Sequence, residues 1–112
     1  MTLGEWIPIY LDAYKRDTIR PDSFYTIQLV AGKIPPDILA MELTEIRPMH
    51  LQRFVNAFGL TASKSSMDKL HVLLNAGFEA AMDNDLCTKN PAVRVKYPRI
   101  HEQPREAYTM DE

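Results

Sequence analysis

The sequence predicts an all-α domain, built as an irregular orthogonal bundle of four main helices. Apolar residues recur at helical spacing in four segments, and the strict apolar–polar alternation of half-buried strands is almost absent. The four segments differ in length, and proline or glycine interrupts the connections between them. These features favour irregular packing of short helices over a regular up-and-down bundle.

The first two helices are predicted from their start and stop signals. Residues 3–16 form the first helix, because Thr2 and Glu5 have the spacing of a capping box and apolar residues follow at helical spacing. The second helix opens at Pro21 or at Ser23 and stops near Gly32. Residues 38–43 are apolar except for Glu42 but too few for a stable helix alone, so they are predicted to be a turn or an extended connector.

The third helix is predicted to begin at Pro48 and to end at Gly59 as a C′ residue. The fourth and longest is capped by one of the serines at 63, 65 and 66 and runs to about Asn84. Gly77 inside it predicts a close helix crossing. The predicted core consists of Trp6, Tyr10, Ile27, Phe54, Leu70, Leu74 and Phe78, with Tyr14, Phe24 and Phe58 as further core aromatics.

Composition bounds the class of protein. The 112 residues are 46% hydrophobic and 25% charged, which predicts one globular domain. A net charge of -2 excludes a generally basic nucleic-acid coat but allows a local basic face. The single cysteine, Cys87, excludes a disulfide framework and is predicted to be a buried thiol. No apolar run is long enough to span a bilayer, so we expect a cytoplasmic protein with no membrane partner.

Several motifs occur in an order and spacing that resemble one known family. The segments that carry the likeness are residues 6–10, 23–25, 43–46, 50–56, 63–67, 73–81, 85–86, 90–91 and 106–112. Together they resemble the core-binding, SAM-like N-terminal domain of phage-integrase-type tyrosine recombinases. The likeness implies that residues 1–97 are a DNA-binding domain and that residues 98–112 are a linker leading to a catalytic domain absent from this chain.

The resemblance also implies function and partners. It implies a domain that binds double-stranded DNA at a recombination core site during DNA integration and recombination. Sister recombinase protomers would assemble with it in the full-length protein, whereas the fragment alone is expected to be a monomer. The family's catalytic residues would lie beyond this chain, so no catalytic residue, cofactor or metal is expected here.

The best candidate DNA contact is the start of the fourth helix. Free N–H groups, hydroxyls and ammonium groups at a helix N-terminus suit a phosphate, and plain capping beside solvated lysines is the alternative. A second group near the start of the second helix and a third in the C-terminal segment are further candidates, with linker solvation as the alternative for the third. The candidate residues are Lys64, Ser65, Ser66, Lys69, Arg20, Ser23, Tyr25, Lys89, Arg94, Lys96 and Arg99.

Other suggestive residues are assigned structural roles. His50 and Arg53 match a His-x-x-Arg pattern but are interpreted as part of a solvated helix face, with a phosphate contact by Arg53 as an alternative. His71 and His101 have no partner at metal-ligand spacing. A helical protein–protein interaction module without a DNA role remains the rival hypothesis, because the pI of about 5.9 is low for an autonomous DNA-binding domain.

Overall fold

The computed structural model describes residues 1–98, and the secondary-structure elements of this part of the chain are helices. An isolated antiparallel bridge between Thr2 and Glu42 is the β pairing in this part of the chain. The prediction of an all-α domain is therefore confirmed. In chain order the helical elements are α1 (Leu3–Tyr10), the π-helix η1 (Leu11–Lys15), α2 (Pro21–Ala31), α3 (Pro36–Leu39), α4 (Pro48–Phe58), α5 (Lys64–Asp83) and the 3-10 helix η2 (Pro91–Arg94).

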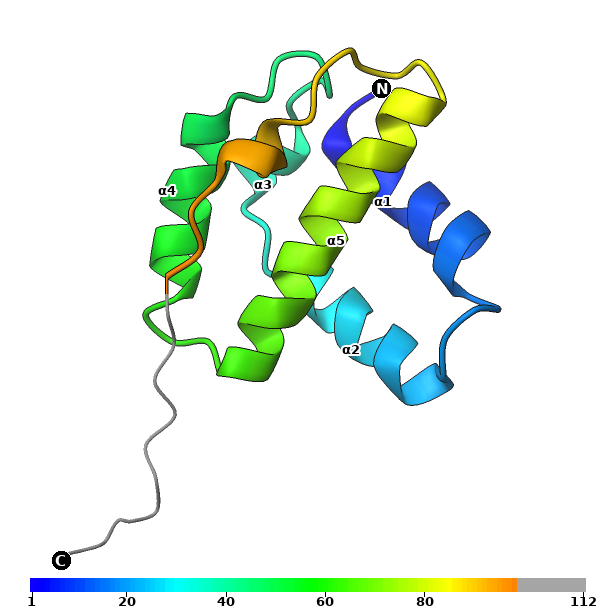
Figure 1. Cartoon of the computed structure of the whole chain (residues 1–112), viewed down its shortest axis with the longest axis vertical. Coiled ribbons are helices and arrows are strands. Elements are labelled where there is room, and N and C mark those ends of the chain that lie inside the picture. Colours follow the sequence, from blue (N-terminus) through cyan, green and yellow to red (C-terminus); the bar gives the residue numbers. More distant parts are fainter. Residues whose placement is uncertain (99–112) are drawn as a thin grey trace, which may run out of the picture.

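The long helix α5 runs through the middle of the molecule (Figure 1). Helices α1 and α2 pack on one side of it, and α4 lies on the other side with η2 against it. Helix α4 runs in the opposite direction to α5, so the end of α4 and the start of α5 meet at the lower end in Figure 1. The start of α2 lies at this lower end too.

The core forms where α1 crosses α5. The indole nitrogen of Trp6 donates a hydrogen bond to the carbonyl oxygen of Gly77 (2.9 Å). Tyr10 packs over the same glycine, which agrees with the predicted crossing. Six of the seven predicted core residues are buried, and Ile27 is only partly buried.

Local signals predicted most helix boundaries. Thr2 and Glu5 form the capping box at the start of α1. Pro21 rather than Ser23 opens α2. Ser63 caps α5, and its side-chain oxygen accepts from the backbone N–H of Ser66 (3.1 Å).

Three predictions of local structure are wrong. Residues 36–39 form a one-turn helix instead of a turn or an extended connector, because Pro36 starts the turn and Ile38 is buried in the core. Tyr14 is 43% exposed instead of buried, since the π turn changes the angular position of the residues after Tyr10. Gly59 is the C-cap of α4 with a right-handed φ of -64° and is not a left-handed C′ residue.

The C-terminal strap, residues 95–98, holds the chain against α4 and α5. Gln52 on α4 donates to the carbonyl oxygen of Lys96 (2.7 Å) and accepts from its backbone N–H (2.8 Å). The ring of Tyr97 stacks on His71 of α5 with 4.1 Å between centroids. A Cβ at Gly59 would lie 2.8 Å from the ring of Pro98, so glycine permits this close approach. The strap therefore leads the chain toward the end where α5 begins (Figure 1).

Candidate nucleic-acid interface

The first two turns of α5 present hydroxyl and ammonium groups to solvent. The hydroxyl of Ser63 donates to the side-chain oxygen of Ser66 (3.1 Å), and Lys69 Nζ donates to the side-chain oxygen of Ser65 (3.2 Å). The hydroxyl groups of Ser65 and Ser66 act as acceptors in these bonds, so each keeps its own hydrogen for an external acceptor. The partial positive charge of the helix N-terminus adds to this set of donors.

The two lysines of this helix start differ in their surroundings. Lys64 Nζ lies 3.3 Å from a carboxylate oxygen of Asp68, one turn further along the helix, and both side chains are exposed. Lys69 contacts a neutral hydroxyl instead. Asp68 thus offsets part of the positive charge that the sequence places at this helix start.

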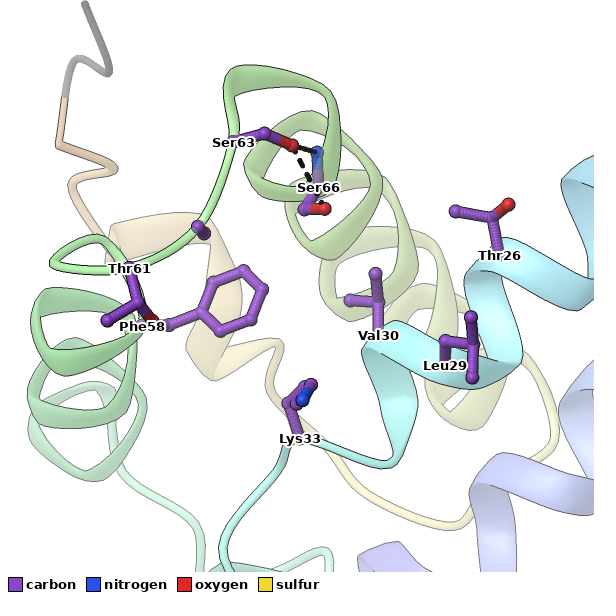
Figure 2. A pocket seen from close by; sticks show the side chains of 9 residues that line it. Thr26, Leu29, Val30, Lys33, Phe58, Thr61, Ser63 and Ser66 are labelled. Atoms are coloured by element: carbon purple, nitrogen blue, oxygen red, sulfur yellow. Dashed lines mark hydrogen bonds between the residues drawn. The ribbon is translucent and has the colours of Figure 1, made fainter.

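A groove of about 460 Å³ separates the start of α5 from α2. Figure 2 shows the ring of Phe58 and the side chain of Val30 facing each other across it, with Ser63 and Ser66 at one edge and Lys33 at another. The groove is thus apolar within and polar at its rim. Lys33 and Thr61, which line it, were not among the sequence candidates.

The position of Lys33 at this groove was not predicted by the sequence analysis. It follows the predicted stop at Gly32 and so looks like a loop residue in the sequence. In the structure, the bundle brings this end of α2 to the first turn of α5. Only the long-range contact between α2 and α5 reveals its place at the groove.

The candidates near the start of α2 are unequally accessible. Arg20 is the exposed N-cap residue of α2, and its side chain makes no capping hydrogen bond. Tyr25 is 62% exposed, whereas Ser23 is partly buried. This helix start lies at the same lower end of the molecule as the start of α5 (Figure 1).

The structure separates the C-terminal candidates from the α5 start. Lys89 and Arg94 lie in the segment after the far end of α5, and η2 lies beside the upper part of α4 (Figure 1). There they line a second groove, of about 410 Å³, together with Arg47, which the sequence analysis did not single out. Lys96 lies on the strap with an exposed side chain. Arg99 lies outside the described residues.

The remaining polar candidates have structural surroundings. His50 Nδ1 accepts from the backbone N–H of Arg47 (3.0 Å) at the start of α4, and Arg53 is exposed on the same helix. Burial raises the pKa of the Cys87 thiol, as expected for an unreactive side chain. Residues 1–98 contain no group of three or more His, Cys, Asp or Glu side chains placed to hold a metal ion. In the same residues, no helix is both long and apolar enough to cross a membrane.

Comparison with known proteins identifies the family. Residues 2–59, more than half of the chain, match the family described as phage integrase, N-terminal SAM-like domain. No curated protein is significantly similar in sequence.

Two solved structures have a similar fold. The integrase-like domain from Bacillus cereus has a TM-score of 0.75 and 22% sequence identity, over 97% of this chain and 93% of that chain. The phage integrase SAM-like domain from Moorella thermoacetica has a TM-score of 0.67 and 20% identity, over 91% of this chain and 88% of that chain. The fold and the sequence match agree, and the chain belongs to the family of phage integrase N-terminal SAM-like domains.

Proposed function

We propose that this chain is the DNA-binding domain of a tyrosine recombinase and that it binds double-stranded DNA at a recombination core site. The proposal includes a catalytic domain in the full-length enzyme and its assembly with sister recombinase protomers. Membership of the integrase family supports it. The observation that carries it is the cluster of hydroxyl and ammonium groups at the start of α5.

The start of α5 has the chemistry of a phosphate contact. The unpaired N–H groups of a helix N-terminus, two hydroxyl donors and the ammonium of Lys69, which has no carboxylate partner among residues 1–98, all favour a bound anion. Lys33 adds a further cation at the edge of the adjoining groove. Phosphate contacts of this kind position a protein on the duplex without reading bases.

The proposal predicts weak, salt-sensitive binding by the isolated domain. Four to six phosphate contacts correspond to a non-specific Kd of about 10⁻⁴ to 10⁻⁶ M and a slope of log affinity against log salt of roughly −4 to −5. The test is a salt titration of duplex affinity for the wild type and for Lys64→Ala with Lys69→Ala. Each substitution should reduce the magnitude of the slope by about one unit and weaken specific and random duplexes alike.

A matched control is available on η1. Lys15→Ala removes one basic side chain that is not among the candidate DNA contacts, so it should leave the affinity and slope nearly unchanged. Unchanged affinity in the double variant would overturn the assignment of this surface.

A protein-interaction module is the second candidate function. The observation in its favour is apolar exposure near the groove, where Leu29 is 51% exposed and Leu60 is 85% exposed. If Leu29→Ser and Leu60→Ser abolish binding to a helical partner protein and leave the duplex affinity unchanged, the result favours this candidate. Loss of duplex affinity in the lysine variants would favour the DNA-binding function.

A further inference from the structure

The basic groove is formed by Arg47, Lys89 and Arg94, at the opposite end of α5 from the proposed DNA contact. The cavity between the start of α4 and η2 measures about 410 Å³, and all three cations line it. A smaller cavity of about 230 Å³ also has Arg47 and Lys89 in its lining. Two segments that are distant in sequence, residues 46–48 and 89–94, therefore bring positive charge to one place.

The basic groove contains no acidic side chain. Neither cavity is lined by Asp or Glu. The ion pairs within residues 1–98 involve other side chains, so the three cations have no carboxylate partner in this part of the chain. The chain as a whole has 15 acidic and 13 basic residues. An acid-free groove with three cations therefore stands out from the rest of the protein.

Hydrogen bonds fix the backbone that carries these cations. The backbone N–H of Arg47 donates to His50 Nδ1 (3.0 Å) as α4 begins. Asn90, which is 8% exposed, caps η2 by accepting from the backbone N–H of Ala92 (2.9 Å). Its amide nitrogen also donates to Glu79 Oε2 (2.9 Å), so this carboxylate is engaged with Asn90 and does not line the basic groove. Lys89 directly precedes Asn90, and Arg94 is the last residue of η2, so the hydrogen bonds of Asn90 stabilise the backbone that carries both cations.

We propose that the basic groove binds the phosphate backbone of a nucleic acid, as a contact separate from the α5 start. This inference rests on the proposed DNA-binding function and adds a second site to it. Two guanidinium groups can each hold a phosphate through paired hydrogen bonds, and the N-terminus of α4 adds partial positive charge. The two cavities share Arg47 and Lys89, so they adjoin each other at these two side chains.

The two contacts are separate in space. Helix α5 has 20 residues and so is about 30 Å long, and its ends mark the two regions. Substitutions in the basic groove therefore leave the serines and lysines of the α5 start in place. This separation allows each contact to be tested without disturbing the other.

The experiment combines chemical-shift mapping with a charge-neutralising variant. The ¹⁵N-labelled chain is titrated with a duplex of about two helical turns and, separately, with inorganic phosphate. We expect the duplex to shift the amide signals of the non-proline residues within 46–49 and 89–94. Arg47→Gln with Arg94→Gln should lower the magnitude of the salt slope by about two units, one for each phosphate contact removed. Lys15→Gln, on η1 and outside the groove, is the matched control.

Each outcome has one meaning. Shifts confined to the α5 start would overturn the basic groove as a DNA contact and leave the proposed function standing. Shifts confined to the groove would support the inference and overturn the assignment of the α5 start. Shifts with inorganic phosphate but none with the duplex would overturn the nucleic-acid ligand in favour of a free phosphate. No shift with either ligand would overturn both the inference and the proposed function. The mapping uses the wild-type chain, so it decides the question even where a variant fails to fold.

Discussion

Gly77 lies inside α5, where glycine lowers helix stability. A Cβ at this position would lie 3.9 Å from the ring carbons of Tyr10, which is ordinary van der Waals contact. Gly77→Ala should therefore stabilise the domain by up to about 1 kcal/mol, because alanine has the higher helix propensity. Urea unfolding measures the change. Gly4→Ala is the contrasting control. A Cβ at this position would lie 3.1 Å from the carbonyl oxygen of Leu39, which is closer than ordinary contact, so the substitution should destabilise the domain.

Phe78 is the most informative single test of the core. Its side chain is 1% exposed and belongs to the cluster that joins α1 to α5. Phe78→Ala should cost about 3–5 kcal/mol of unfolding free energy, from lost apolar burial and the cavity that remains. Val72→Ala, on the same helix but 52% exposed, should cost far less. Equal melting temperatures for Phe78→Ala and the wild type would contradict the assigned core.

Tyr97 gives the strap a measurable pH dependence. Burial raises the pKa of its phenol from about 10 to about 12. As the pH rises through this window, the unfolded chain releases the phenolic proton while the folded chain keeps it. This part of the stability is therefore fully present below pH 10 and is lost as the pH approaches 12.

Substituting this phenol tests both the burial and the hydrogen bonding of the strap. Among the described residues, the buried hydroxyl of Tyr97 has no hydrogen-bond partner. Tyr97→Phe should therefore stabilise the domain by about 1 kcal/mol near neutral pH and reduce the loss of stability between pH 10 and 12. Urea unfolding at a series of pH values measures both effects. A large destabilisation at neutral pH would show that the hydroxyl has a partner.

The helices themselves could be predicted because their ends carry short-range signals. Pro21, Pro48 and Ser63 each open a helix at the place where the sequence indicates a start. The π turn after Tyr10 has no comparable signal, so the exposure of Tyr14 was not predictable from spacing alone. The short helix α3 depends on burial of Ile38 against other elements, which a local pattern does not show.

The candidate site could be predicted only in part, for the same physical reason. Ser63 and the lysines that follow it lie within the first two turns of one helix, so their proximity was evident from the sequence. Lys33 reaches the groove beside them through packing of α2 on α5. Arg47 joins Lys89 and Arg94 only because η2 packs on α4. Long-range packing, rather than any motif, thus creates the second region.

The molecule as a whole is expected to bind DNA without cutting it. The resemblance to tyrosine recombinases implies that strand cleavage depends on residues of a separate catalytic domain. We expect the 112-residue chain to form no covalent adduct with a suicide substrate. Gel electrophoresis under denaturing conditions would detect such an adduct as a slowly migrating band, and its appearance would contradict this expectation.

The overall charge of -2 makes the distribution of acidic residues decisive for DNA affinity. Asp68 pairs with Lys64 at the α5 start and places a negative charge beside the proposed phosphate contact. Asp68→Asn removes that charge and frees the lysine, so duplex affinity at low salt should rise about threefold, the effect of one unit charge about 6 Å from a phosphate in water. The gain should shrink as salt screens the interaction.

Asp12 provides the control for this prediction. It forms the same kind of pair, with Arg16, the C-cap residue of η1 four positions further on, and both side chains are exposed. Asp12→Asn changes the net charge by the same amount but at a different element. If overall charge governs binding, the two variants will gain affinity equally. If the start of α5 contacts the phosphates, Asp68→Asn will gain more, because a charge acts most strongly on the phosphate nearest to it. Fluorescence anisotropy of a labelled duplex, measured across a salt series for both variants, distinguishes these results.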